Sequence, residues 1–507
     1  MRLKEYKTMK QEREDSYNHI LKYTGIFGGV QGLNILIGLV RNKIVAVLLG
    51  PGGMGLASLF NTVVSFISQA TNLGLSFSAV RHVSELFDRG DEQRIAHFVQ
   101  VVRAWSLLTA LLGMLVCILA GPLLSSQTFS WGDHTLHFVM LSPAVAMLAI
   151  TGGETAILKG ARKLKDLAII QLFSVFVALL ISVPIYYFYN QSGIVPVIVL
   201  MAFSSMLFTL RFSYRLYPLQ LSGSKGILGE GMEMVRLGIA FVMAGILGSG
   251  AEMFIRSYLN VEGDLDVVGF YNAGFMLTVT YAGMVFTAME TDYFPRLSAI
   301  SANRREMRQV VNRQIEVSLL MVSPMLCLFM IAMPIIIPIL FTSEFNVVIG
   351  MAQVAVLSMY IKAVSLPISY LTLARGDSVA FLVLEACFDV VMVLFVIWGY
   401  HYLGLFGTGL GLTLSYLLDI LIVYGNAYFR YGYRVSGSVL QYASILIPLG
   451  VAAYIVTLIE NPVMYWLLGS ILCFVSFAVS IHVLRQKTSL WEAFMNKLKV
   501  KLSDGET

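Results

Sequence analysis

Four basic residues lie inside apolar stretches that are long enough to cross a membrane. They are Arg41, Lys43, Arg256 and Lys362. Burying one such side chain in a bilayer costs ~2.5–3.5 kcal/mol even on the lenient insertion scale, so it must pair with an acid, extend to the headgroups or line a wet cavity. In a cavity, guanidinium and ammonium groups would bind an anion such as a phosphate. We therefore take these four as candidate substrate-binding residues.

The two halves of the chain carry this charge at matching positions. When residues 55–61 are aligned with residues 269–275, Arg41 and Lys43 fall opposite the immediate neighbours of Arg256. Internal repeats in transporters place the substrate site at the repeat interface. The spacing therefore favours an anion site between two cationic helices.

Acids inside the apolar stretches offer a second chemistry, that of a coupling proton or sodium ion. The candidates are Glu252, Glu385, Asp389 and Asp419. Glu385 and Asp389 share one helix face, and the plainer alternative is that they neutralise Lys362. Likewise, Glu252 lies one helical turn before Arg256, and the two side chains could form a local ion pair. Arg41 and Lys43 could instead extend to the headgroups.

The first apolar stretch also carries polar and small residues. Gln31 and Asn34 are candidate cavity-lining polar residues, and Gly25, Gly28, Gly29 and Gly32 form two pairs with Gly-x-x-x-Gly spacing. Such pairs favour close helix packing, and the same residues would also suit a bendable helix that lines a cavity. Both alternatives stay open at this point.

No motif for catalysis is found in the sequence. His134 and His137 beside Asp133 loosely resemble a metal pair, but no third ligand signature accompanies them. The glycines around Pro51 are not followed by the Lys and Ser or Thr of a phosphate-binding loop. The four cysteines lie in apolar stretches and indicate no disulfide framework. We expect a protein that is not an enzyme and that has no cofactor and no metal.

These side chains can be positioned only by helices that span a membrane. Hydrophobic residues make up 57% and charged residues 13% of the 507 residues, and the mean hydropathy is +0.76. Soluble proteins carry ~25% charged residues. A soluble protein could not bury so much apolar surface, which excludes a soluble enzyme, a nucleic-acid-binding domain and a disordered scaffold. The composition predicts an all-α polytopic membrane protein.

A spanning helix needs ~20 mostly apolar residues, and we identify fourteen stretches of that kind. They cover residues 24–48, 54–80, 98–124, 138–158, 167–189, 194–217, 237–259, 267–291, 314–341, 348–373, 379–402, 406–429, 439–459 and 463–484. If the N-terminus lies inside the cell, 31 of the 35 Lys and Arg residues fall in inner segments, among them Arg103, and the outer loops hold none. This bias predicts an even number of spans and two cytoplasmic termini.

The spans suggest an organisation into lobes. We predict a cytoplasmic N-terminal segment at 1–23 that is no cleavable signal peptide, an N-lobe at 24–217, a cytoplasmic linker at 218–236 and a C-lobe at 237–430. Helices thirteen and fourteen would occupy 431–485, followed by a cytoplasmic tail at 486–507.

One stretch resembles a known family. Residues 41–55, with the sequence RNKIVAVLLGPGGMG, resemble the start of the O-antigen translocases, the Wzx-type polysaccharide flippases of bacteria. Asn72-Leu73-Gly74 and residues 371–376 and 405–409 also fit. The resemblance implies the multidrug/oligosaccharidyl-lipid/polysaccharide (MOP) exporter superfamily, with two six-helix lobes in a V around a central cavity. Many Wzx-type members have twelve spans, and a count of fourteen looks more like the lipid II flippase branch.

The resemblance also implies a function. The substrate would be an oligosaccharide on a polyprenyl diphosphate, flipped across the bacterial inner membrane by alternating access, with a proton or sodium counter-ion and polysaccharide polymerase machinery as further partners. Three alternatives stay open: a cation-coupled multidrug antiporter of the same superfamily, a membrane-embedded polymerase or ligase, and a scaffold that transports nothing. A polymerase or ligase would want a large outer loop, and the longest predicted outer connection, 125–137, is short. The sequence does not specify the glycan, the coupling ion or the oligomeric state.

Overall fold

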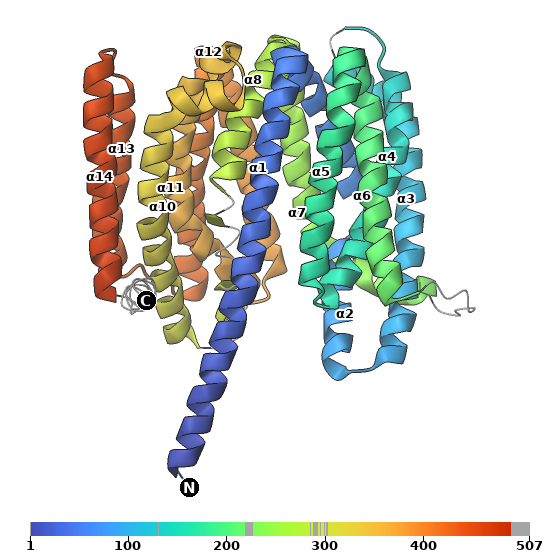
Figure 1. Cartoon of the computed structure of the whole chain (residues 1–507), viewed down its shortest axis with the longest axis horizontal. Coiled ribbons are helices and arrows are strands. Elements are labelled where there is room, and N and C mark those ends of the chain that lie inside the picture. The colour runs from blue at the N-terminus through green and yellow to red at the C-terminus, as the bar shows by residue number, and fades with distance from the viewer. Residues whose placement is uncertain are drawn as a thin grey trace, which may run out of the picture. The chain divides into compact units, whose positions relative to one another are not determined.

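The computed structural model describes residues 2–129, 131–218, 227–283, 285–286, 293–294, 296–298, 300 and 303–487. All regular elements in these ranges are helices (Figure 1). The chain forms two compact units, residues 1–249 and 250–507, and the boundary lies within the helix α7 (Ile227–Glu262). The prediction of an all-α fold is confirmed.

Seven helical elements precede α7 in the first unit. They are α1 (Arg2–Thr71), α2 (Leu75–Arg89), α3 (Glu92–Thr128), α4 (Thr135–Gly160), α5 (Leu164–Tyr189), the short η1 (Asn190–Gly193) and α6 (Ile194–Leu216). Helix α3 runs beside α4, and α1 runs beside α5. The apolar core between α2, α3 and α4 includes the fully buried Val83, Val102 and Ile157. Asp91 caps α3 because its carboxylate accepts a hydrogen bond from the Arg94 amide.

The second unit continues from α7 through eight further helical elements. They are α8 (Leu265–Phe275), the π-helix η2 (Met276–Tyr281), α10 (Arg304–Leu340), η3 (Ser343–Val347), α11 (Val348–Ala374), α12 (Ser378–Tyr431), α13 (Gly437–Thr457) and α14 (Pro462–Lys487). Helices α10, α11 and α12 pack in sequence, and α13 and α14 lie side by side against α10.

Helix α12 folds back on itself at Gly404, where φ is +58°. Such a backbone angle is easy only for glycine. The two arms meet at Gly399 and Gly407, where a Cβ on either residue would overlap the carbonyl oxygen of the other. Small residues therefore allow the two arms to pack backbone against backbone.

A seam of polar and thiol groups fastens α14 to α10. The Ser323 and Ser476 hydroxyls are 3.1 Å apart, and the Cys327 and Cys473 sulfurs are 3.5 Å apart. One turn further, the Tyr465 hydroxyl donates to the Ile331 carbonyl at 2.8 Å. Because polar contacts between helices are directional, they fix α14 in one register on α10.

Nine stretches of the described residues form helices that are long and apolar enough to cross a membrane. Three of them, Leu36–Thr71, Lys165–Leu216 and Ser378–Tyr431, are interrupted by Gly50, by η1 and by Gly404. Large apolar side chains such as Phe188 and Leu119 are 74% and 70% exposed, as expected for helices that face lipid. The polytopic membrane class is confirmed. The count of fourteen, the lobe boundaries and the cytoplasmic location of the termini stay predictions.

Candidate functional site

Arg41, a predicted substrate-binding residue, lies in α1 and faces α5 and α6. Its guanidinium contacts the Ser182 hydroxyl and the Met201 sulfur, each at 3.3 Å. It also interacts electrostatically with the Tyr186 hydroxyl. Lys43, two residues later, is half-buried. The guanidinium of Arg41 is therefore held between helices of the first unit.

The sequence also predicts two cavity-lining polar residues, Gln31 and Asn34, on the same helix. The backbone of Gln31 lies within α1, but its side chain is outside the described part of the structure. Asn34 is half-buried, and its Oδ1 atom has no hydrogen-bond partner among the described residues. A buried amide oxygen of this kind is a natural contact for water or for a hydroxyl of a passing ligand.

The first unit also contains a buried ion pair that the sequence analysis missed. Arg103 of α3 donates to Glu154 of α4 at 2.9 Å, and both side chains are more than 90% buried. The Ser213 hydroxyl donates to the same carboxylate, and the Arg103 guanidinium lies over the Tyr214 ring at 4.1 Å. The basic-residue pattern predicts an inner, cytoplasmic segment for Arg103, and that location stays a prediction; the structure adds that its side chain is packed among three helices. Its position, five residues inside a predicted span, was the available signal.

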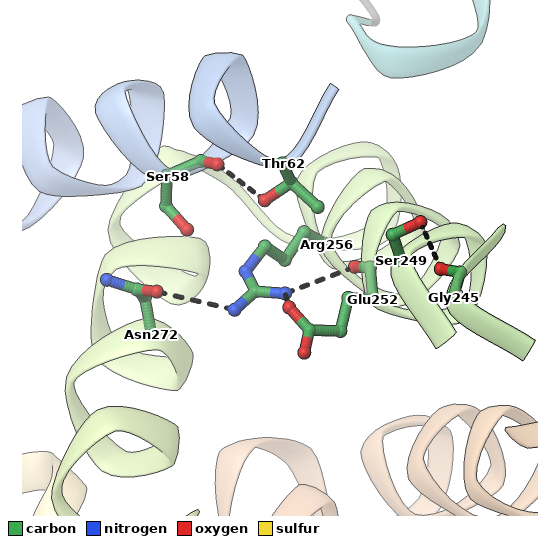
Figure 2. A network of polar contacts seen from close by, with 7 residues as sticks. All are labelled: Ser58, Thr62, Gly245, Ser249, Glu252, Arg256 and Asn272. Carbon is green, nitrogen blue, oxygen red and sulfur yellow. Dashed lines mark hydrogen bonds and ion pairs between the residues drawn. The ribbon is translucent and has the colours of Figure 1, made fainter. Parts of the chain in front are cut away.

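In the second unit, Arg256 does form the local ion pair with Glu252. Its Nη1 atom is 3.0 Å from the Glu252 carboxylate, and Nη2 lies 3.5 Å from Oδ1 of Asn272 on α8 (Figure 2). The Arg256 side chain is 6% exposed, whereas that of Glu252 is 41% exposed. The guanidinium also lies within 6 Å of the Tyr271 and Phe275 rings. The site therefore combines a buried cation with an accessible acid.

Lys362 of α11 faces both arms of α12. Its charge acts on Glu385 in the first arm and on Asp419 in the second. The ammonium lies 5.8 Å from the Phe286 ring centre and 5.9 Å from that of Tyr416. Within the described ranges, Lys362 forms no ion pair of 4 Å or less. The charge of the Lys362 ammonium is thus balanced by carboxylates at longer range, and its N–H groups can donate hydrogen bonds to other groups.

Asp389 completes this group of charged residues. It is buried, it lies within electrostatic reach of Glu385 and Glu252, and its Oδ2 atom has no hydrogen-bond partner among the described residues. The group in the second unit thus contains two bases, Arg256 and Lys362, and four acids. The anion-binding role of the two bases stays a prediction, and the excess of carboxylates adds capacity for protons or cations.

The residues around His134 do not form a metal centre. The Nδ1 atoms of His134 and His137 are 3.4 Å apart, and Asp133 is occupied by hydrogen bonds from the amide and hydroxyl of Thr135. In the described part of the chain, no group of three or more His, Cys, Asp or Glu side chains is arranged to hold a metal ion. Burial and the neighbouring His137 lower the pKa of His134. The cluster instead packs with aromatic rings, among them Phe60 and Phe129.

Comparison with known proteins gives consistent results. The model of the polysaccharide biosynthesis protein family matches residues 44–350. The lipid III flippases of Escherichia coli (strain K12) and Shigella flexneri are each 23% identical over 286 residues. The match covers 54% of this chain and 66% of the length of each relative, which is just under two thirds.

Solved structures share the fold. An inward-facing multidrug-resistance MATE family transporter of the MOP superfamily superimposes with a TM-score of 0.67 at 15% identity, over 80% of this chain and 96% of that one. The lipid II flippase MurJ in an inward closed conformation gives a TM-score of 0.62 at 13% identity, over 91% and 99% of the two chains. The chain therefore has the fold of MOP superfamily transporters.

Proposed function

The chain belongs to the polysaccharide biosynthesis protein family, and on that premise we propose that it is a flippase for a lipid-linked oligosaccharide. The substrate is a glycan unit on a polyprenyl diphosphate, such as an O-antigen unit, and it moves from the inner to the outer leaflet of the bacterial inner membrane by alternating access. Both termini lie in the cytoplasm. The similarity to the lipid III flippases and the MOP transporter fold support this proposal.

Lys362 is the observation on which the proposal depends. A lysine inside a spanning helix is retained only for a strong reason, because its burial is costly. Here the ammonium lies between aromatic rings and forms no close ion pair with any residue that the structure describes. It is therefore available to a phosphate oxygen.

The other residues act around this contact. Arg256 supplies a second cation to the diphosphate, and Arg41 and Lys43 supply positive charge from the first lobe. Residues 24–217 and 237–430 are the two lobes, and Gln31 and Asn34 contact sugar hydroxyls. Glu252, Glu385, Asp389 and Asp419 carry a proton or sodium ion that returns the empty carrier.

A second candidate, a cation-coupled multidrug antiporter, has one observation in its favour. Four carboxylates against two bases in the second unit, with Asp389 buried, would suit a cationic drug. The family match favours the glycan. A polymerase or ligase has less support still, because the relatives and the solved structures that the chain resembles are flippases and a transporter.

Reconstituted vesicles separate these functions. Fluorescent lipid-linked oligosaccharide added to one leaflet is expected to become accessible to a glycosidase on the other side only with the active protein. The Arg81→Gln variant, which changes an exposed cation paired with Glu85, is the matched control and is expected to flip normally. Drug efflux without movement of the glycolipid would reject the flippase.

A further inference from the structure

A pocket of about 860 Å³ opens in the second unit where α10 begins and α14 ends. Its charged wall is formed by three arginines of α10: Arg305, Arg308 and Arg313. Its opposite end is apolar and is lined by Val317, Leu320 and Leu484. The pocket is therefore charged at one end and apolar at the other.

The wall of the pocket carries net positive charge. All three arginines are exposed, and none of them forms an ion pair with a residue in the described ranges. Of the lining residues, Glu316 is the acid, and it is buried. The formal balance is three cations against one carboxylate, which suits an anionic ligand.

Hydrogen bonds hold one side of the pocket together. The Asn312 side chain donates to the Arg434 carbonyl at 3.2 Å and accepts from the Ser436 amide at 2.9 Å, so it ties α10 to the segment before α13. The Arg308 Nε atom donates to the same Arg434 carbonyl at 2.9 Å. Ser436 also caps α13, whose N-terminus lies at the pocket and adds a favourable dipole for an anion.

The position of the pocket along α10 matches a membrane boundary. Helix α10 has 37 residues, which gives a length of ~55 Å at ~1.5 Å per residue. The hydrocarbon core is only ~30 Å thick, so part of α10 must extend beyond it. The arginines lie on the first three turns, and the apolar lining begins at Val317. This order of lining residues along α10 is the one expected if the polar end lies at headgroup level and the apolar end at the level of the acyl chains.

We propose that this pocket binds the phosphodiester headgroup of an anionic membrane phospholipid. Arg305 and Arg313 contact the phosphate, and Val317, Leu320 and Leu484 contact the upper part of an acyl chain. Basic pockets between membrane helices bind such headgroups in general. Inorganic phosphate would leave the apolar end of the pocket without a contact. Phospholipid is far more abundant in a membrane than a glycolipid substrate, so mass action favours phospholipid as the occupant.

The bound lipid has a structural consequence. It contacts α10, the start of α13 and the end of α14, so it joins the two C-terminal helices to the rest of the unit. Because a ligand that binds the folded state stabilises it, anionic phospholipid raises the unfolding temperature of the protein. This inference holds whatever substrate the chain transports.

The test measures lipid binding to the full-length protein in detergent by native mass spectrometry and by thermal unfolding. The probes are short-chain phosphatidylglycerol, phosphatidylcholine, inorganic phosphate and a polyprenyl diphosphate. The variant Arg305→Gln/Arg313→Gln is expected to bind phosphatidylglycerol about 30-fold more weakly, from ~1 kcal/mol per basic residue. The variant Arg305→Lys/Arg313→Lys is expected to keep most of the affinity, which shows that the effect follows charge and not misfolding.

The control Arg89→Gln/Arg94→Gln removes the same charge from exposed positions of the first unit, and it is expected to bind like the wild type. Equal loss in the control would overturn the proposal, because binding would then follow net charge alone. Protection by inorganic phosphate as strong as by phosphatidylglycerol would identify a free-anion site instead. Binding of the polyprenyl diphosphate in preference to phosphatidylglycerol would reassign the pocket to the substrate.

Discussion

Arg103 and Glu154 form a buried ion pair of 2.9 Å although 51 residues separate them in the chain. The pair joins α3 to α4, and Ser213 joins the same carboxylate to α6. It therefore connects three helices of the first unit at one point. The Nη1 atom of Arg103 is buried and has no hydrogen-bond partner among the described residues. Few other polar groups could therefore compensate if the ion pair were broken.

Removing one partner of this pair is expected to destabilise the protein strongly. Glu154→Gln leaves Arg103 as an unpaired buried charge, and such changes cost ~3–5 kcal/mol. Thermal unfolding of the purified protein measures the effect. Glu85→Gln, which breaks an ion pair whose side chains are 63% and 49% exposed, is the control and is expected to cost ~1 kcal/mol or less. Similar small losses in both variants would contradict the prediction.

Arg256 is expected to be required for transport but not for membrane insertion. Arg256→Ala should abolish flipping, since it removes the cation assigned to the diphosphate. Arg256→Lys should retain part of the activity, because the charge remains while the bidentate fork is lost. Vesicle flipping and the amount of protein in the membrane are measured together. Full activity of Arg256→Ala would remove this residue from the site.

Lys362 permits a test that separates substrate binding from simple charge balance. Lys362→Met is expected to reduce flipping at least tenfold, the equivalent of ~1.4 kcal/mol. If the lysine only balances Asp419, the double variant Lys362→Met/Asp419→Asn will recover activity. If the lysine binds the substrate, the double variant stays inactive, which is the outcome that we expect.

Asp377 is expected to give a defined pH dependence of stability. It caps α12 through the Ala380 amide, accepts from the Tyr431 hydroxyl and lies 2.7 Å from Arg430. Burial acts to raise the pKa of Asp377, but the Ala380 amide, Tyr431 and Arg430 outweigh it, and the pKa lies below its usual 3.8. A lowered folded-state pKa contributes stability that is present above pH ~4 and is lost as the pH falls through the folded pKa.

The measurement compares wild type with Asp377→Asn, which keeps the cap and removes the charge. The expected difference in unfolding free energy is ~0.5–1 kcal/mol at pH 7, because Arg430 is largely exposed, and it should shrink below pH ~4. A difference that stays constant down to pH 3 would show that the Asp377 charge has no part in it.

The membrane potential is expected to drive export of the anionic substrate. Moving one charge across the field is worth ~2.3 kcal/mol per 100 mV, so a substrate with two net negative charges gains ~4–5 kcal/mol per 100 mV on leaving an inside-negative cell. An ionophore that collapses the potential should slow net export. An unchanged rate would reject this driving force.

The helical architecture could be predicted because membrane helices leave a strong signal. Apolar stretches of sufficient length predicted α3, α4, α13 and α14 within a few residues of their ends, except that α3 begins at Glu92 and not at residue 98. The π-helix at Met276–Tyr281 was not predicted, because its hydrogen-bond register depends on packing and leaves no periodicity in the sequence.

The candidate site could be predicted only in part. The ion pair of Arg256 with Glu252 follows from a spacing of four on one helix. By contrast, Lys362 meets Glu385 and Asp419 because α12 folds back at Gly404, and Arg103 meets Glu154 across two helices. Contacts of this second kind depend on how distant helices pack against each other, and the spacing of residues within one helix does not reveal that packing.

The thiols of Cys327 and Cys473 allow a direct test of whether α14 moves relative to α10. Dissolved oxygen with a mild copper catalyst would oxidise the two thiols to a disulfide that joins α14 to α10, because the sulfurs lie 3.5 Å apart, and no introduced cysteine would be needed. If the disulfide-linked protein still transports, α13 and α14 move together with α10. If transport stops until the disulfide is reduced, α14 must move relative to α10 during transport.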